Sequence, residues 1–276
     1  MMLTWRKLVL AEREEEWLGQ LSDFAERLAV ISLPGGKSIR IEVYALSKKE
    51  GAALIGSHGG ALRALDERLF IHQKTARSGP IRIREKLLVV GSAKELAAAA
   101  RKFPGRKTLV VPASMAFGTG EHATTAACLR FLADLAGASK WDMLDLGTGS
   151  GILALGAKLL GAGRVDAFDF DPHAVRLAKE NARSNEIEGV HFTECDVTKW
   201  TPPRKWDVVA ANLFSEVLVR AAPRIARATK RGGWLVFSGV MRHQEKGCVV
   251  ALKKHGFAVE KTSRRGKWVT TLARKR

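Results

Sequence analysis

The residues best suited to chemistry in this 276-residue chain form a glycine-rich segment, Asp145-Leu146-Gly147-Thr148-Gly149-Ser150-Gly151. Residues 141–146 have the apolar composition of a buried parallel strand, and residues 152–160 have helical spacing. The glycines therefore lie at a strand-to-helix turn. Because glycine lacks a Cβ and tolerates positive φ, a nucleoside cofactor can lie directly against such a backbone. We predict a cofactor loop contributed by Asp145, Gly147, Gly149 and Gly151.

The glycine spacing distinguishes two classes of cofactor. A dinucleotide fingerprint requires a further glycine three residues after the second, and Ile152 occupies that position. The spacing instead resembles the loop of class I methyltransferases, which bind S-adenosyl-L-methionine and usually open this motif with an acidic residue such as Asp145. The resemblance implies S-adenosyl-L-methionine as the cofactor.

Two acidic residues follow the next predicted strands. Asp169 ends the strand predicted over 164–171, roughly 20 residues beyond the glycines, where a carboxylate can accept hydrogen bonds from both ribose hydroxyls. Its neighbour Asp171 precedes Pro172 in a helix N-cap pattern, which is compatible with Asp169 binding ribose. Asp196 follows the strand predicted over 190–195, where it would lie beside the adenine amino group. An ordinary surface role for Asp196 is an equal alternative.

Length and composition set the broad class of protein. A chain of 276 residues favours two domains, and it has no apolar run long enough to span a membrane. The acidic run at 12–16 interrupts any signal-peptide core, so we expect a cytoplasmic protein. Cys128, Cys195 and Cys248 are isolated and not spaced as metal ligands. We therefore expect reduced thiols and no metal site.

The formal net charge of +18 is concentrated in two segments. One covers residues 74–107, and the other is the tail, residues 261–276. Such clusters suit a polyanionic partner, so RNA contact through the basic linker and tail is one expectation. A basic surface with no dedicated ligand is an equal alternative.

The order of predicted elements separates two domains. Residues 1–70 read as a small α+β, ferredoxin-like domain, with strands at 4–10, 29–33 and 38–46, a helix at 12–28 and another from Ser47. We expect a basic linker over 71–107, with a possible strand at 81–90. Residues 108–276 alternate strands and helices, which predicts a doubly wound, mostly parallel α/β sheet. The last two predicted strands, 257–262 and 267–273, lack a helix between them and predict a closing antiparallel hairpin.

A second motif, Met115-Ala-Phe-Gly-Thr-Gly-Glu-His-Ala-Thr-Thr125, precedes the helix before the glycine loop. With that loop, Asp169 to Pro172, Ala211-Asn212-Leu213 and Ser238-Gly239-Val240, it strongly resembles the ribosomal protein L11 methyltransferase family over about residues 108–276. The resemblance implies that the motif folds over the methionine end of the cofactor, with Phe117, Thr119 and Thr125 as contacts. It also implies that residues 1–70 recognise ribosomal protein L11.

The implied reaction is direct displacement of the sulfonium methyl group by an amine. Such catalysis depends on positioning and on a neutral amine, because an ammonium has no lone pair. Asn212, at the end of the fourth predicted strand, can accept a hydrogen bond from the amine; a structural Asn in a turn is the alternative. We predict a protein N-methyltransferase acting on Lys side chains or the N-terminal amine of L11 or a similar protein. An RNA methyltransferase is the second hypothesis, and a non-catalytic binding module is the third.

Overall fold

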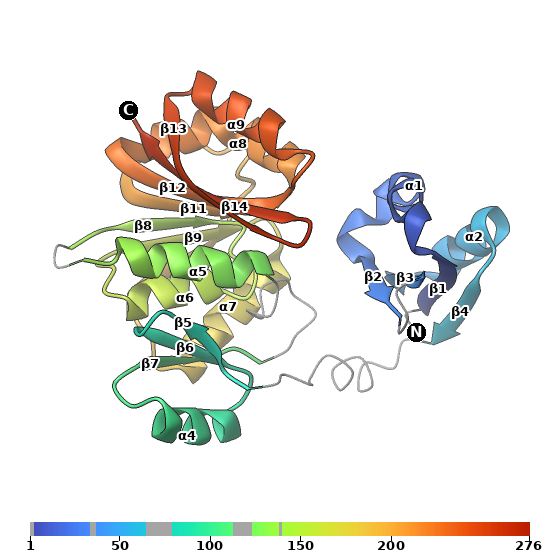
Figure 1. Cartoon of the computed structure of the whole chain (residues 1–276), viewed down its shortest axis with the longest axis horizontal. Coiled ribbons are helices and arrows are strands. Elements are labelled where there is room, and N and C mark those ends of the chain that lie inside the picture. Colours follow the sequence, from blue (N-terminus) through green and yellow to red (C-terminus); the bar gives the residue numbers. More distant parts are fainter. Residues whose placement is uncertain (1–2, 34–36, 65–78, 113–122, 138–139) are drawn as a thin grey trace. The chain divides into compact units, whose positions relative to one another are not determined.

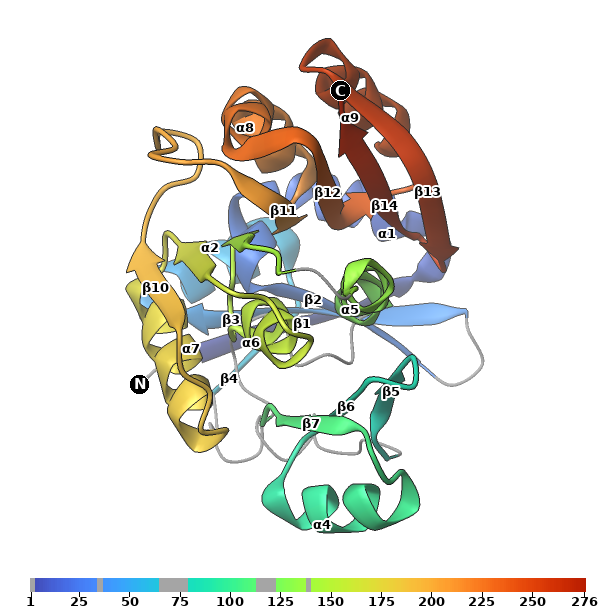
Figure 2. The ribbon, with the colours of Figure 1, turned by 90° about the vertical axis from the view of Figure 1, so that its left-hand side faces the viewer.

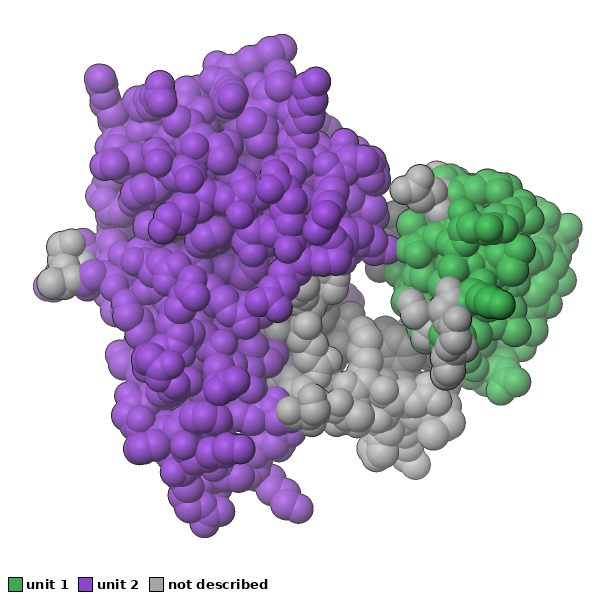
Figure 3. Space-filling view, viewed as in Figure 1, with its two compact units in different colours: residues 1–74 green, residues 75–276 purple. Residues whose placement is uncertain are grey.

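A computed structural model describes residues 3–33, 37–64, 79–112, 123–137 and 140–276 (Figure 1). The chain divides into two compact units, residues 1–74 and 75–276 (Figure 3). In the described ranges, no helix is both long and apolar enough to cross a membrane.

The first unit is a four-stranded antiparallel sheet of order β2-β3-β1-β4, which is the ferredoxin-like order. Its elements are β1 (Leu3–Leu10), η1 (Ala11–Arg13), α1 (Glu14–Gln20), η2 (Ser22–Arg27), β2 (Leu28–Ser32), β3 (Ser38–Leu46), α2 (Lys48–His58) and β4 (Ala61–Ala64). Trp5, Ile41 and Leu54 lie in its buried core. The predicted ferredoxin-like domain is confirmed.

Two details of this unit differ from the prediction. The helix expected over 12–28 is broken into η1, α1 and η2, because Gly19 and the Ser22-Asp23 pair are poor in a helix interior. The sequence also gave no expectation of β4, which follows Gly60. Gly60 has φ +88°, and a Cβ there would lie 2.6 Å from the carbonyl oxygen of Arg6, so only glycine lets the chain return beside β1.

The expected linker over 71–107 is wrong for residues 81–107, which are folded into the second unit. They form β5 (Ile81–Ile83), β6 (Leu87–Val90), α4 (Ala93–Lys102) and, with the residues that follow, β7 (Lys107–Val110). The central strand β6 is buried on both faces. Leu87 and Val89 join the main core of the unit, whereas Leu88 and Val90 pack with α4.

The remainder of the second unit is a seven-stranded sheet of order β10-β9-β8-β11-β12-β14-β13. Its strands are β8 (Met143–Leu146), β9 (Val165–Asp169), β10 (Val190–Glu194), β11 (Trp206–Asn212), β12 (Thr229–Met241), β13 (Phe257–Arg265) and β14 (Trp268–Lys275). The first five strands are parallel, and β14 is antiparallel to both of its neighbours. The predicted doubly wound sheet with a closing hairpin is confirmed.

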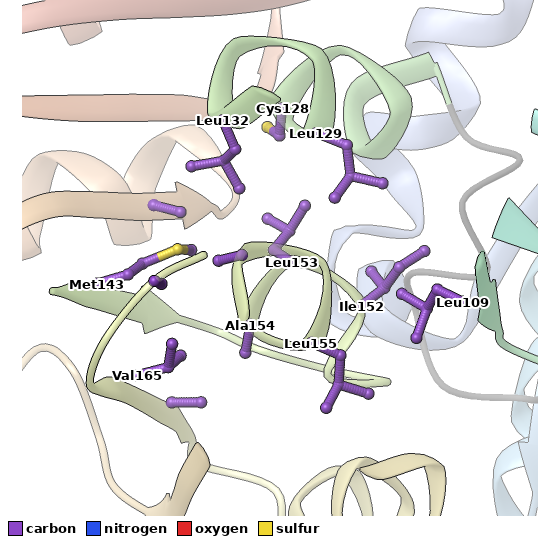
Figure 4. Close-up of a cluster of buried hydrophobic side chains, with 14 of the residues drawn as sticks. Leu109, Cys128, Leu129, Leu132, Met143, Ile152, Leu153, Ala154, Leu155 and Val165 are labelled. Carbon is purple, nitrogen blue, oxygen red and sulfur yellow. The ribbon is translucent and has the colours of Figure 1, made fainter. Parts of the chain in front are cut away.

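Helices cover both faces of this sheet (Figure 2). Helices α5 (Ala123–Leu135), α6 (Ile152–Leu159) and α7 (Pro172–Ser184) lie on one side, and α8 (Ser215–Ala228) and α9 (Glu245–Lys254) on the other. Alternate residues of β11 face the two hydrophobic cores on either side of the sheet. Val208 and Ala210 belong to the first core, and Val209 and Ala211 belong to the second. Figure 4 shows the first core, where Leu109 of β7 approaches Ile152 of α6.

Because residues 81–107 are folded into the second unit, they should be needed for a truncated fragment of this unit to fold. A fragment of residues 75–276 should unfold cooperatively. A fragment of residues 108–276 lacks Leu87 and Val89 from its core, and losing each large buried side chain costs about 2 to 5 kcal/mol. Thermal denaturation followed by circular dichroism should show a melting transition for the longer fragment and a much lower or absent one for the shorter. Equal melting temperatures would contradict the assignment of residues 81–107 to this core.

Candidate active site

The glycine loop is held against the end of β9 by its own backbone. The N–H groups of Gly147 and Thr148 donate to the carbonyl oxygen of Phe168, at 2.8 and 2.9 Å. The side chain of Asn181, on α7, donates to the carbonyl oxygen of Ser150 at 2.8 Å, and both residues are buried. The predicted strand-to-helix turn is therefore fixed from two neighbouring elements before any ligand binds.

All three glycines have positive φ, of 72°, 54° and 82° at Gly147, Gly149 and Gly151. A Cβ on Gly147 would lie 2.4 Å from Cδ2 of Leu213, and one on Gly151 would lie 3.0 Å from Cβ of Ala178. Gly151 is also the N-cap of α6. The positive φ angles thus favour glycine at Gly147 and Gly151, and packing against Ala178 adds to this at Gly151, apart from any contact with a cofactor.

Asp145 lies at the end of β8 with no exposed surface. One carboxyl oxygen, Oδ2, accepts a hydrogen bond of 2.7 Å from the Thr148 hydroxyl. The other oxygen, Oδ1, is buried and has no hydrogen-bond partner in the described part of the chain. Burial raises the pKa of Asp145 to about 7, and the charge of Asp169 adds a smaller increase. The Thr148 hydrogen bond and the nearby Ala154 N–H oppose this shift.

Asp169 ends the neighbouring strand β9 and is only 7% exposed. Its carboxylate accepts backbone hydrogen bonds from Gly149 at 2.8 Å and from Asp171 at 3.1 Å. Burial raises its pKa, and these backbone hydrogen bonds oppose the shift. Asp171 caps α7 by accepting from the N–H of His173, with Pro172 at the start of the helix. The predicted N-cap is confirmed, which leaves Asp169 as the carboxylate at the loop.

Asp196 follows β10, next to the end of β9, because the N–H of Cys195 donates to the carbonyl oxygen of Asp169 at 2.7 Å. Its Oδ1 accepts from both the backbone and the hydroxyl of Thr198, at 2.9 and 2.7 Å. Its Oδ2 lies 3.4 Å from Nζ of Lys199. Hydrogen bonding to Thr198 lowers its pKa. Asp196 thus stabilises a local turn at the edge of the same region.

Asn212 ends β11, the strand paired with β8 on the side opposite β9. Its Nδ2 donates long hydrogen bonds to the hydroxyls of Thr124 and Thr125 at the start of α5, at 3.4 and 3.5 Å. Its Oδ1 is buried without a hydrogen-bond partner in the described ranges. Thr125, a predicted cofactor contact, is itself fully buried and orients the Asn212 amide.

The structure therefore brings together the loop glycines, Asp145, Asp169 and Asn212 at the carboxyl edge of three adjacent strands, with Asp196 at the border. Phe117 and Thr119 lie outside the described residues. Sequence reasoning missed three residues of the site. Thr148 donates to Asp145, Asn181 holds the glycine loop, and Leu213 packs on Gly147. Thr148 was within the glycine motif, whereas the other two have no local signal.

The strand order, the reversed β14 and the glycine loop after β8 define a class I methyltransferase fold. The chain belongs to the family described as ribosomal protein L11 methyltransferase (PrmA), whose model matches residues 11–276.

Individual relatives agree with this membership. The ribosomal protein L11 methyltransferase of Pelobacter propionicus is 38% identical over 206 residues, and that of Chloroflexus aurantiacus is 36% identical over 219 residues. Each match covers 71% of this chain, but 63% and 65% of the respective relative, so the chain spans less than two thirds of their length. A crystal structure of ribosomal protein L11 methylase from Lactobacillus delbrueckii subsp. bulgaricus has a TM-score of 0.61 and 25% identity, covering 72% of this chain and 98% of that one.

The raised pKa of Asp145 predicts a pH dependence of folding. Below about pH 4 both folded and unfolded states hold the proton, whereas between about pH 4 and 7 only the folded state does. This contribution to stability is therefore lost as pH rises through about 7. The Asp145→Asn variant has no such titration and keeps an acceptor for Thr148. Urea unfolding without ligand should show the variant gaining about 2 kcal/mol relative to the unchanged protein between about pH 5 and 8. A constant difference would place the Asp145 pKa in its ordinary range.

Proposed function

We propose that this protein is an S-adenosyl-L-methionine-dependent protein N-methyltransferase. The observation that supports this most is a pair of buried acceptors that have no hydrogen-bond partner among the described residues, Oδ1 of Asp145 and Oδ1 of Asn212, at the ends of adjacent strands. A buried acceptor with no hydrogen bond costs about 1 to 3 kcal/mol, so both oxygens favour a ligand that donates hydrogen bonds. The reaction brings two amines to this edge, one on the cofactor and one on the acceptor.

The residues present fit the cofactor. Asp145, with one free oxygen and a raised pKa, suits the cofactor's ammonium group, because a cation would offset the cost of the buried carboxylate. Asp169 has unused lone pairs beside the loop for ribose hydroxyls. Gly147, Gly149 and Gly151 form the loop; Phe117, Thr119, Thr125 and Asp196 complete the proposed set. When bound, S-adenosyl-L-methionine supplies a sulfonium methyl group that an amine lone pair displaces in line, leaving S-adenosylhomocysteine.

Asn212 is the proposed catalytic residue. Its Oδ1 can accept a hydrogen bond from the N–H of a neutral amine and so direct the nitrogen lone pair toward the methyl group. The contacts to Thr124 and Thr125 hold the Asn212 amide at the start of α5. This role is positioning, since the amine arrives already neutral and loses its proton after the new N–C bond has formed.

The proposed substrate is ribosomal protein L11 or a similar protein, methylated on Lys side chains or its N-terminal amine. Membership of the L11 methyltransferase family supports a protein acceptor over the RNA methyltransferase alternative. The two unpartnered acceptors support an enzyme over a non-catalytic binding module. A ribosomal protein substrate also supports a cytoplasmic location.

We further propose that the first unit binds the protein acceptor. Its helices cover the face of the sheet that bears Trp5 and Ile41, while Leu8 and Leu10 on β1 point to the other face. These two leucines are 64% and 52% exposed, which is unusual for large apolar side chains on one strand. An open sheet face with apolar and charged groups suits a folded protein domain as partner.

Replacing Asn212 with Ala separates positioning from binding. The Asn212→Ala variant should bind S-adenosyl-L-methionine with unchanged affinity by calorimetry. Its rate of transfer of labelled methyl to L11 should fall by about 100-fold or more, because the amine loses its orientation. Asn212→Asp, which keeps an acceptor oxygen, should lose less. Near-normal turnover of Asn212→Ala would leave Asn212 as a turn residue only.

Replacing Leu8 and Leu10 with Ser tests the role of the first unit. The double variant should raise KM for L11 by about tenfold or more, because each exposed leucine buried at an interface contributes on the order of 1 to 2 kcal/mol, while cofactor affinity stays unchanged. Val250→Ser is a matched control, since this 46% exposed residue lies on α9 of the second unit. An unchanged KM for the double variant would reject this face as the acceptor surface.

A further inference from the structure

Two basic segments far apart in the sequence meet on helix α5. From the first segment, Arg84 binds the Asp134 carboxylate with two hydrogen bonds of 2.7 Å, and Nζ of Lys86 donates to the carbonyl oxygens of Ala133 and Ala136, at 2.7 and 2.8 Å. From the tail, the β13–β14 hairpin contacts the same helix. Figure 1 shows α5 between β5 and this hairpin. The fold therefore gathers positive charge that the sequence distributes over two ends of the unit.

Arg130, on α5, stands between these two groups. Burial, followed by the positive charges of Arg265 and Arg84, lowers the pKa of its guanidinium. Within the described ranges, no carboxylate forms an ion pair with Arg130 or Arg265, although the neighbouring Arg264 binds Glu245 at 2.6 Å. Asp134, one turn along α5 from Arg130, is already engaged by both hydrogen bonds of Arg84. The positive charge at Arg130 is thus partly desolvated and not neutralised.

The cluster reaches the edge of the sheet where the active site lies. Met241, at the carboxyl end of β12, pairs with Trp268, which also pairs with Arg265 at the tip of the hairpin. Helix α5 begins at the same edge, where Thr124 contacts Asn212. Trp268 itself is partly exposed beside the basic tip, with Lys267 over its ring. An aromatic ring next to guanidinium groups can stack with a nucleobase.

We propose that Arg130 and Arg265, next to the Arg84–Asp134 pair, form a binding site for the phosphate backbone of RNA, running along α5 to the active-site edge. Guanidinium groups bind phosphate oxygens through paired hydrogen bonds, and a phosphate at Arg130 would neutralise the charge that this protein leaves unpaired. Two arginines from two elements suit a polymer with repeated anions, and Trp268 favours RNA over an acidic peptide. The site does not depend on the identity of the protein substrate.

The test measures binding of fluorescein-labelled polyuridylate by anisotropy over a series of NaCl concentrations. The Arg130→Gln/Arg265→Gln variant should bind about tenfold or more weakly than the unchanged protein. The slope of log affinity against log salt should fall by about 1 to 2, because each phosphate contact contributes about 0.7 on single strands. The matched control, Lys94→Gln/Arg101→Gln, removes the same charge from exposed positions on α4 and should change both quantities much less.

Because neither Arg130 nor Arg265 has an ion-pair partner among the described residues, the double variant should melt no lower than the unchanged protein. If it does melt lower, exposed Arg265→Gln alone must still weaken binding and lower the slope. Equal losses in the α4 control would show a general charge effect and overturn the site. Unchanged RNA affinity would also overturn the proposed site. A competition experiment gives a second check. If polyglutamate displaces the labelled RNA at a lower concentration of negative charges than unlabelled polyuridylate does, the surface binds an acidic protein instead.

Discussion

A carboxyl group without exposed surface, that of Asp145, stands at the end of β8 and has one satisfied oxygen. Taking a charged carboxylate out of water is costly, so the group keeps its proton to about pH 7 unless a cation arrives. Around it the chain supplies hydrogen bonds and one further carboxylate, Asp169, but no cation among the described contacts. We therefore propose that the site gains most from a ligand that carries a positive charge, and a sulfonium cofactor with an ammonium group is such a ligand.

The segment after β11 is closely packed between two glycines. Leu213 packs on Gly147, and its carbonyl oxygen would lie 2.3 Å from a Cβ on Gly239, which has φ +81°. Gly147, which follows β8, and Gly239, on β12, lie on either side of β11 and thus let the backbone beside Asn212 fit between the cofactor loop and β12. Catalysis by positioning requires such fixed geometry, because a displaced amine loses its alignment with the methyl group.

Local patterns were sufficient to predict the sheet, the glycine loop and the closing hairpin, because buried parallel strands and strand-to-helix glycines leave strong signals. They failed for residues 81–107. The turn between β5 and β6 contains Arg84 at φ +50° and no glycine or proline. Because no turn-forming residue marks this position, residues 81–90 were expected to form one strand, whereas they form a hairpin. The free oxygens of Asp145 and Asn212 depend on which strands are neighbours, and the support from Asn181 and Leu213 comes from distant segments. Such non-local contacts have no signature within a single stretch of sequence.

Proton release on cofactor binding tests the central claim most directly. If the cofactor's ammonium group pairs with Asp145, the carboxyl must lose the proton that it holds near pH 6.5, while the α-amino group of the ligand is already charged at that pH. Calorimetry in buffers of different ionisation enthalpy should show release of roughly half a proton or more per bound S-adenosyl-L-methionine at about pH 6.5. The release should vanish in Asp145→Asn. Binding without proton release in the unchanged protein would contradict the account.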